Sequence, residues 1–401
     1  MPARSLHLSR MGLSVGESAT LRQAARVAAL RSTGRTVYNF TVGEPDFDTP
    51  ATIRDAAHRA IEEGHTRYTP SAGTADLRAA VARYYAERHG IAWQPSQVIV
   101  SAGVKQVLWT ALAALVDPGD EVVLLAPYWV SYVAYVQMLG GVPRVVRGAR
   151  ERDFKVTGDQ LRAVLGARTR AVLFNTPINP TGAVYSADEI RDLLSPLADH
   201  DAVVLSDEIY ENMVYGVPHV SPVAAIPELA GRILVASGAS KSFAMTGWRV
   251  GYGLGPEPLV RSMIDLQSHM TGNASSVGQR AALAALGLDP AAAREIPERF
   301  ARRREICLEL LARAPEIRFP VPRGAFYVFL DATPFFGAWA GGREIHDSAA
   351  LAAHLLETHG LAVVPGAAFD DDTGIRVSYT LSEDDLRRGF GQLLDVLRAR
   401  A

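Results

Sequence analysis

The sequence has one cysteine, Cys307, and no long apolar run. A single cysteine cannot form an internal disulfide or supply a thiolate cluster for a metal, which favours a reducing compartment. No stretch approaches the roughly 18 apolar residues that a membrane span requires. Arg4 and Arg10 are not followed by a continuous apolar segment, so no signal peptide is expected. These features together predict a cytoplasmic protein with no membrane partner.

An excess of charge of either sign is also missing. Lysine and arginine together number 41 and aspartate and glutamate 43, which gives a net charge of −2. A nucleic-acid partner is therefore not indicated. The chain of 401 residues is 48% hydrophobic and 21% charged, which is typical of a folded protein with a large core. At roughly 100–200 residues per domain, this length predicts two domains or one large domain with a satellite.

Short runs of Val, Ile and Leu alternate with helical patterns from about residue 97 onward. Because these runs are apolar without alternation, both faces of each strand are expected to be covered. Strands interleaved with helices predict an α/β fold with a mainly parallel central sheet and helices on both faces. The expected strands are 98–100, 121–125, 144–146, 170–174, 202–205, 232–236 and 250–254, with a helix over 105–116.

The C-terminal part has the pattern of a smaller α+β domain. Helices are expected at 297–313 and 386–397, and strands at 324–330, 362–364 and 375–378. Residues 1–45 have no place in the large sheet and are assigned to the small domain. The expected division is therefore 46–290 for the large domain, with 1–45 joining 291–401 in the small one.

Polar and glycine-containing segments follow five of the expected strands. Ligands of open parallel sheets bind beyond the C-terminal ends of the strands. Segments that are distant in the sequence are therefore expected to converge on one site. The five segments are 101–103, 127–129, 175–182, 207–210 and 238–241.

Lys241 is followed eight positions later by Arg249. An amine that binds an aldehyde covalently, with an arginine fork for a phosphate, meets the requirements of pyridoxal 5'-phosphate (PLP). A desolvated and cationic setting would lower the pKa of this amine. Ser240 can bond a phosphate oxygen, and the small residues before it allow close approach of a ligand. The alternatives are a solvated surface position for Lys241 and a salt bridge on a strand for Arg249.

Three further residues suit the ring of the same ligand. Asp207 follows a buried strand, where its carboxylate would keep a pyridine nitrogen protonated. Tyr210 and Asn179, the latter in a proline-bracketed turn, could donate to the phenolic oxygen of the ring. The alternative interpretations are a helix N-cap for Asp207, a packed core residue for Tyr210 and a simple turn residue for Asn179.

Other candidates have plainer alternatives. Gly103 precedes the helix that contains Lys105, and free N–H groups at a helix start bind anions. Trp129 could stack on a flat ring or fill the core. Arg376 is a lone arginine in a short strand, and its partner is either a protein acid or the α-carboxylate of an amino acid. The glycines of 251–255 lack the helix and acidic residue of a dinucleotide loop, so a nicotinamide dehydrogenase is discarded.

The motifs TVGEPDFD (41–48), PYWVS (127–131), NPTG (179–182), SDEIY (206–210) and TGWR (246–249) occur together with Lys241 and Arg376. The chain thereby resembles the class I PLP-dependent aminotransferases, specifically the prokaryotic-type aspartate aminotransferase branch of PLP fold type I. The resemblance extends almost from end to end. It implies that PLP is the cofactor and that the chain forms a homodimer.

The resemblance also implies a role for each matching position. Lys241 would form the Schiff base and move the proton, Asp207 would pair with the pyridine nitrogen, and Trp129 would stack on the ring. Tyr210 and Asn179 would contact the ring oxygen. Tyr68 would reach the phosphate of the neighbouring subunit. The other phosphate contacts would be Gly103, Val104, Lys105, Ser240 and Arg249, and the substrate contacts Gly43, Trp129, Asn179 and Arg376; no metal is implied.

The reaction implied is transfer of an amino group from an L-amino acid to a 2-oxo acid such as 2-oxoglutarate. The donor is left open between aspartate-like, aromatic and specialised amino acids, and Lys105 favours a dicarboxylate only mildly. Many family members have serine at the position of Gly238, so one phosphate bond is moved or lost. A PLP-dependent lyase, synthase or amino acid oxidase is the alternative on the same fold. A PLP-binding sensor is a further alternative, without a DNA-binding segment before residue 45.

Overall fold

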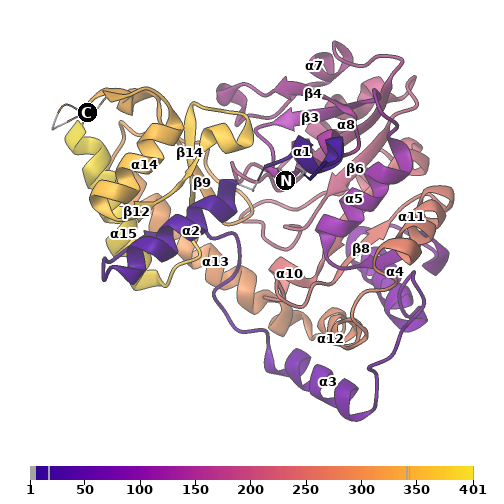
Figure 1. Cartoon of the computed structure of the whole chain (residues 1–401). Helices are drawn as coiled ribbons and strands as arrows, with labels where there is room; N and C mark the ends of the chain where they lie inside the picture. Colours follow the sequence, from indigo (N-terminus) through magenta and orange to yellow (C-terminus); the bar gives the residue numbers. More distant parts are fainter. Residues whose placement is uncertain (1–5, 17–18, 340–341, 343, 401) are drawn as a thin grey trace, which may run out of the picture.

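The computed structural model describes residues 6–16, 19–339, 342 and 344–400. The chain forms two lobes, a larger one built on a wide sheet and a smaller one built mainly from the C-terminal third (Figure 1). We call them the large and the small domain. This arrangement confirms the predicted α/β fold with a smaller α+β domain.

The large domain contains a seven-stranded sheet in the order β2-β8-β7-β6-β5-β3-β4. All neighbouring strands run parallel except β8, which is antiparallel to both β2 and β7. The C-terminal ends of the six other strands therefore meet at one edge. The strands are β2 (Val98–Ser101), β3 (Glu121–Ala126), β4 (Val142–Arg147), β5 (Thr169–Asn175), β6 (Val203–Asp207), β7 (Ile233–Gly238) and β8 (Gly251–Leu254).

Both faces of the sheet are covered, as the apolar runs predict. Successive residues of a strand point to opposite faces, so Ala171 and Leu173 belong to one core cluster and Val172 and Phe174 to the other. One cluster includes helices α5 (Val104–Leu115), α6 (Ser131–Met138) and α11 (Glu257–Met270). The other includes α4 (Ala75–His89), α7 (Gly158–Arg162) and α8 (Ala187–Leu194). Strand β4 is the exception, because it is an edge strand with several exposed residues.

The small domain contains a three-stranded antiparallel sheet in the order β13-β14-β9. The expected strand at 362–364 is in fact divided, because Ala362 pairs in one sheet and Val364 in another. The N-terminal segment contributes β1 (Tyr38–Asn39), which pairs in parallel with β12 (Leu361–Ala362). The other elements are β13 (Val364–Pro365), β14 (Gly374–Ser378), β9 (Tyr327–Asp331), α2 (Ala19–Ser32), α13 (Pro290–Leu311), α14 (Ser348–His359) and α15 (Glu383–Arg400).

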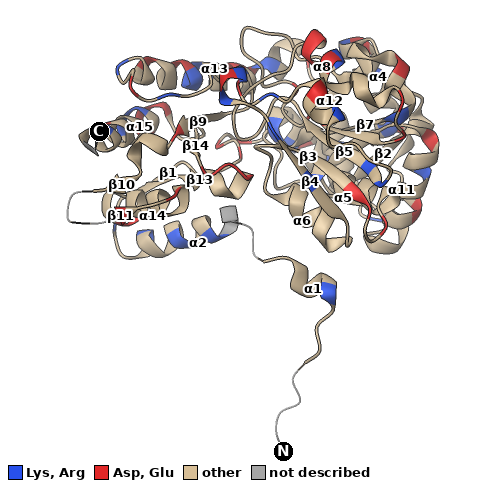
Figure 2. Cartoon of the chain, turned by 90° about the horizontal axis from the view of Figure 1, so that it is seen from above, with Lys and Arg blue, Asp and Glu red and all other residues tan. Residues whose placement is uncertain are grey.

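Two outlying helices complete the arrangement. Helix α1 (Arg10–Ser14) lies against α6, and α3 (Ala51–Glu62) packs on α12 (Ser276–Leu286). Basic and acidic residues are interspersed around the molecule (Figure 2). Among the described residues, no helix combines the length and apolar character needed to cross a bilayer.

Candidate active site

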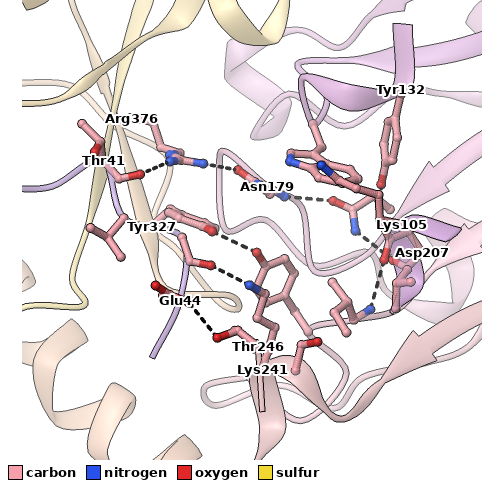
Figure 3. Close-up of a pocket in the computed structure, with 18 of the residues that line it drawn as sticks. Thr41, Glu44, Lys105, Tyr132, Asn179, Asp207, Lys241, Thr246, Tyr327 and Arg376 are labelled. Atoms are coloured by element: carbon pink, nitrogen blue, oxygen red, sulfur yellow. Dashed lines mark hydrogen bonds between the residues drawn. The ribbon is translucent and has the colours of Figure 1, made fainter. Parts of the chain in front are cut away.

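A cavity of about 630 Å³ opens at the edge where the parallel strands end, next to the small domain. Its walls combine side chains of the large domain with Thr41, Tyr327 and Arg376 (Figure 3). Of the predicted site residues, all but Gly103 and Tyr68 line this cavity. The segments that follow different strands thus converge in one place, as the sheet topology requires.

Lys241 lies on the short helix α10 (Ala239–Ser242), directly after β7, and points into the cavity. Its Nζ donates a 2.6 Å hydrogen bond to the carbonyl oxygen of Gly43. Burial, together with the charges of Arg249 and Arg376, lowers the pKa of this amine to about 8 against the opposing effect of Glu44. About half of the amine is therefore neutral at pH 8 and able to attack an aldehyde.

Asp207 is the last residue of β6 and is 4% exposed. The Tyr132 hydroxyl donates to Oδ2 at 2.7 Å, and the backbone N–H of Ile209 donates to Oδ1 at 3.2 Å. The second bond resembles that of a helix N-cap, which was the alternative interpretation of Asp207. Burial raises the pKa of this carboxyl to about 6, while the bond from Tyr132 lowers it. A buried carboxyl of this kind is suited to a cationic partner in the cavity.

Arg376 is 2% exposed and reaches the cavity from β14. Nη1 donates to the side-chain oxygen of Asn179 at 3.0 Å, and Nη2 donates to the carbonyl oxygen of Thr41 at 2.9 Å. Within the described part of the chain, no carboxylate pairs with this guanidinium and its buried Nε has no hydrogen-bond partner. A buried cation without a protein acid is a candidate anchor for a ligand carboxylate.

Asn179 connects this arginine to Asp207. The backbone N–H of Asn179 donates to Asn175 Oδ1 at 2.9 Å. Asn175 Nδ2 in turn donates to the carbonyl oxygen of Asp207 at 2.8 Å. A continuous set of hydrogen bonds therefore fixes the distance between the cation on one wall and the carboxylate on the other (Figure 3).

The hydroxyls of Tyr210 and Tyr327 are 2.9 Å apart. Both rings are buried, and both line the cavity. The ring of Tyr210 also packs edge-on against Phe326 as a core residue does, while its hydroxyl bonds to Tyr327 and the residue lines the cavity. Tyr327 lies under the Arg376 guanidinium, which is 4.4 Å from its ring centroid.

An anion-binding corner forms where α5 begins. The N–H groups of Val104 and Lys105 belong to the first turn of this helix, where no intrahelical acceptor exists. Gly103 precedes them with φ +86°, and a Cβ there would lie 2.5 Å from the Arg249 guanidinium. Arg249 donates to the carbonyl oxygen of Thr246 at 2.8 Å and, in the described structure, makes no salt bridge. Ser240 lines the same cavity.

Close packing of the backbone explains why position 238 is a glycine. A Cβ at this position would lie 2.9 Å from both the Cα of Gly251 and the carbonyl oxygen of Val250. Strands β7 and β8 approach too closely here for a side chain. The residues of 251–255 belong to strand β8 and its end, which agrees with rejecting them as a dinucleotide loop.

Lys105 and Trp129 lie together on one wall. The Lys105 Nζ is 5.1 Å from the centroid of the Trp129 ring. Burial and the neighbouring Arg249 lower the pKa of Lys105. Tyr68 lies outside the cavity in the connection between α3 and α4, with 96% of its surface exposed. An aromatic side chain so exposed is available to a second molecule.

The sequence analysis did not assign several residues that line this cavity. Tyr132 lies three residues after Trp129, a spacing that places both on one side of a helical turn. Tyr327 is a tyrosine within a fully buried strand, where its hydroxyl needs a partner. The others are Ala24, Thr41, Val42, Glu44, Asn175, Ile209, Thr246 and Gly247.

A separate buried cluster lies near the end of β6. Glu208, Glu211 and His219 have potential metal-ligating atoms within 4.8 Å of one another. Each carboxylate is already engaged, Glu208 by His219 at 2.8 Å and Glu211 by His89 at 3.0 Å. The geometry is that of two buried histidine–glutamate pairs.

Comparison with known proteins agrees with this geometry. The model of the aminotransferase class I and II family matches residues 35–393, so the chain belongs to this family. The aspartate aminotransferase of Geobacillus stearothermophilus is 39% identical over 397 residues, covering 99% of this chain and 100% of the relative. The aspartate/prephenate aminotransferase of Cereibacter sphaeroides is 41% identical over 382 residues, covering 94% and 96%.

Solved structures show the same fold. The aspartate aminotransferase of Rhizobium meliloti has a TM-score of 0.95 at 37% identity and covers 99% of this chain and 100% of that one. The Thermus thermophilus aspartate aminotransferase with maleate has a TM-score of 0.90 at 38% identity, covering 98% and 100%. The chain is thus a PLP-dependent aminotransferase of fold type I. These comparisons give no support to a lyase, synthase or oxidase.

The cavity suits PLP on its own chemistry. It offers an amine of lowered pKa, a buried carboxyl, phenolic and amide groups, and an anion-binding helix start beside an arginine. These are the groups that an aldehyde, a pyridine nitrogen, a ring oxygen and a phosphate require.

Proposed function

We propose that this enzyme transfers the amino group of a dicarboxylic amino acid, aspartate, to 2-oxoglutarate. The observation that carries the proposal is the placement of Arg376 and Lys105 in the cavity around Lys241, where the third cation, Arg249, is assigned to the phosphate. Arg376 is buried without a protein acid, and Lys105 is partly desolvated on a different wall. A substrate with two carboxylates can neutralise both.

The same proposal assigns the cofactor contacts. Lys241 holds the aldehyde, Asp207 faces the pyridine nitrogen, and Trp129 covers the ring. Tyr210 and Asn179 contact the ring oxygen. The phosphate contacts are Gly103, Val104, Ser240, Arg249 and the backbone N–H of Lys105, whose side chain is left for the substrate. Bound PLP supplies an electron sink for the charge left when a proton leaves the α-carbon of the substrate.

The residues of the chain provide orientation and proton transfer. Arg376, with Asn179 and the backbone at Gly43, holds the α-carboxylate and fixes the α-carbon in one orientation. The Lys241 amine accepts the α-proton, and its lowered pKa keeps it in the neutral form that accepts one. Asp207, held by Tyr132, would keep a negative charge against the pyridine nitrogen.

The relatives support a dicarboxylate. Several of them are aspartate aminotransferases, and one solved structure contains maleate, which is itself a dicarboxylate. The name aspartate/prephenate aminotransferase also describes transfer to or from molecules with two carboxylates. Lys105 is the residue of this cavity that we assign to the second carboxylate.

The test is a half-reaction assay with single amino acids, following conversion of the PLP-loaded enzyme by its visible spectrum. Aspartate is expected to convert the enzyme faster than phenylalanine or alanine. Lys105→Met should lower kcat/KM for aspartate about 10- to 100-fold, because one charge-assisted hydrogen bond is lost. The kcat/KM for alanine should change much less. Equal losses for both amino acids would contradict the assignment of Lys105.

The proposal includes a homodimer in which Tyr68 reaches the phosphate in the partner subunit. Its high exposure outside the cavity of its own chain supports this role. Mixing inactive Lys241→Ala and Tyr68→Ala chains should restore activity, because one site of each hybrid dimer is then intact. A monomeric mass in solution, or no restoration, would contradict it.

Two further expectations belong to the proposal. The division at residues 45 and 290 is supported by the pairing of β1 with β12, although α1 lies against the large domain. A cytoplasmic location is supported by the single cysteine, Cys307, which is buried and unpaired. Limited proteolysis tests the first and cell fractionation the second.

A further inference from the structure

Tyr210 is assigned above to the ring oxygen of the cofactor, but its hydroxyl has only one proton. In the structure this hydroxyl already shares a 2.9 Å hydrogen bond with the hydroxyl of Tyr327. If Tyr210 donated to Tyr327, it would have no proton left for the cavity. The direction of this one bond therefore decides whether Tyr210 can act as a donor.

The surroundings of Tyr327 determine that direction. Its ring lies 4.4 Å from the Arg376 guanidinium, and the nearby cation favours the ionised form of this phenol. Burial raises the pKa of both tyrosines and Arg376 opposes the increase at both, but the pKa of Tyr210 is raised further. In a pair of phenols, the more acidic one is the better hydrogen-bond donor.

The Tyr327 hydroxyl is also fixed in place. It lies against Gly43, where an added Cβ would be 3.1 Å away. Strand β9 anchors the ring through its pairing with β14, in which Tyr327 is opposite Ser378. The hydroxyl of Tyr327 is therefore held at hydrogen-bonding distance from Tyr210.

We propose that Tyr327 is a positioning residue whose hydroxyl donates to Tyr210 and thereby directs the single proton of Tyr210 towards the ring oxygen of the cofactor. A hydrogen bond received by Tyr210 also polarises its own O–H group and makes it a stronger donor. The proposal rests on the assignment of Tyr210 to the ring oxygen. It adds a residue from the small domain to the control of the cofactor's electronic state.

The test uses the visible spectrum of the PLP-loaded enzyme as a function of pH, with Tyr327→Phe as the principal variant. This change removes the hydroxyl and keeps the ring beneath Arg376. A hydrogen bond to the ring oxygen withdraws electron density and lowers the proton affinity of the linked Lys241 nitrogen. We call the hydrogen bond from Tyr327 to Tyr210, with the one from Tyr210 to the ring oxygen, the relay. Losing the relay should therefore raise the midpoint of the spectral transition by roughly 0.5–1 pH unit.

Tyr379→Phe is the matched control. The Tyr379 hydroxyl is buried in the same region and donates to the carbonyl oxygen of Ala325 at 3.2 Å, but it does not line the cavity. This variant removes a buried phenolic hydroxyl without touching the relay, and its spectral midpoint should remain that of the unmodified enzyme. Thermal unfolding of both variants reports whether either loses its fold.

Tyr210→Phe and the double variant separate the possible outcomes. Tyr210→Phe should shift the midpoint at least as far as Tyr327→Phe, and the double variant no further than Tyr210→Phe. An unshifted Tyr327→Phe, or additive shifts in the double variant, overturns the relay while the assigned function stands. If Tyr210→Phe itself leaves the midpoint unchanged, the assignment of Tyr210 in the proposed function fails as well.

Discussion

Arg376 in the small domain donates a 3.0 Å hydrogen bond to the side-chain oxygen of Asn179 in the large domain. The bond belongs to a set that continues through Asn175 to the carbonyl oxygen of Asp207. The group proposed to bind a substrate carboxylate is thereby held in register with the group proposed to bind the cofactor. Catalysis by orientation depends on such fixed distances, since small displacements are costly.

Replacing Asn179 with alanine should weaken substrate binding more than it slows turnover. The guanidinium of Arg376 would lose one of its two restraining acceptors and spend less time in the productive geometry. We expect KM for aspartate to rise about 10-fold, with a smaller decrease in kcat. Steady-state kinetics measures both. An unchanged KM would show that Asn179 does not hold the arginine.

The pKa of Lys241 predicts how the cofactor-free enzyme takes up PLP. Only the neutral amine attacks the aldehyde, so the uptake rate should rise with pH through a midpoint near the amine's pKa of about 8. At pH 7 about one tenth of the amine is neutral. Glu44 raises this pKa, so Glu44→Gln should move the midpoint to lower pH. Stopped-flow absorbance checks both, and a flat rate profile would contradict the assignment.

Gly103 provides a test of the anion-binding corner. Alanine at this position is strained at φ +86° and would approach the Arg249 guanidinium within 2.5 Å. The matched control is Gly216→Ala, since Gly216 has φ +69° but open space around it. Both changes should cost about 1 kcal/mol of stability or more. Only Gly103→Ala should also weaken PLP binding, by about 10-fold, and equal PLP affinities would place the phosphate elsewhere.

Tyr132 controls the ionisation of Asp207. Its hydrogen bond lowers the pKa of a carboxyl that burial raises to about 6. Tyr132→Phe removes the lowering effect, so the Asp207 pKa rises and less carboxylate remains at a given acidic pH. The pH at which the holoenzyme loses PLP on acidification should move up by about one unit. Equilibrium dialysis measures this; an equal loss of affinity at pH 6 and pH 8.5 would indicate a packing defect instead.

Sequence patterns were most informative where local composition reflects the final environment. The apolar runs at Val98–Ser101 and Ile233–Gly238 are strands because burial on both faces selects such residues. Lys241, Asp207 and Asn179 lie at or within a few residues of the C-terminal ends of strands, and parallel topology alone brings such positions to one edge. These features needed no long-range information.

Other features depend on partners that are distant in the sequence. The split of the strand at 362–364 follows from pairing of Ala362 with Asn39 in β1, and no local signal in the short segment indicates it. The exposed residues of β4 reflect its place at the sheet edge, which composition does not determine. Tyr327 becomes part of the site because Tyr210 and Arg376 arrive from other elements.

The covalent link between PLP and Lys241 is the central claim, and borohydride reduction of the holoenzyme followed by peptide mass spectrometry tests it most directly. We predict a stable adduct on the peptide that contains Lys241, and no adduct with Lys241→Ala, which should still bind PLP but lose turnover. An adduct on another lysine, such as Lys105, or undiminished turnover of Lys241→Ala, would contradict the account.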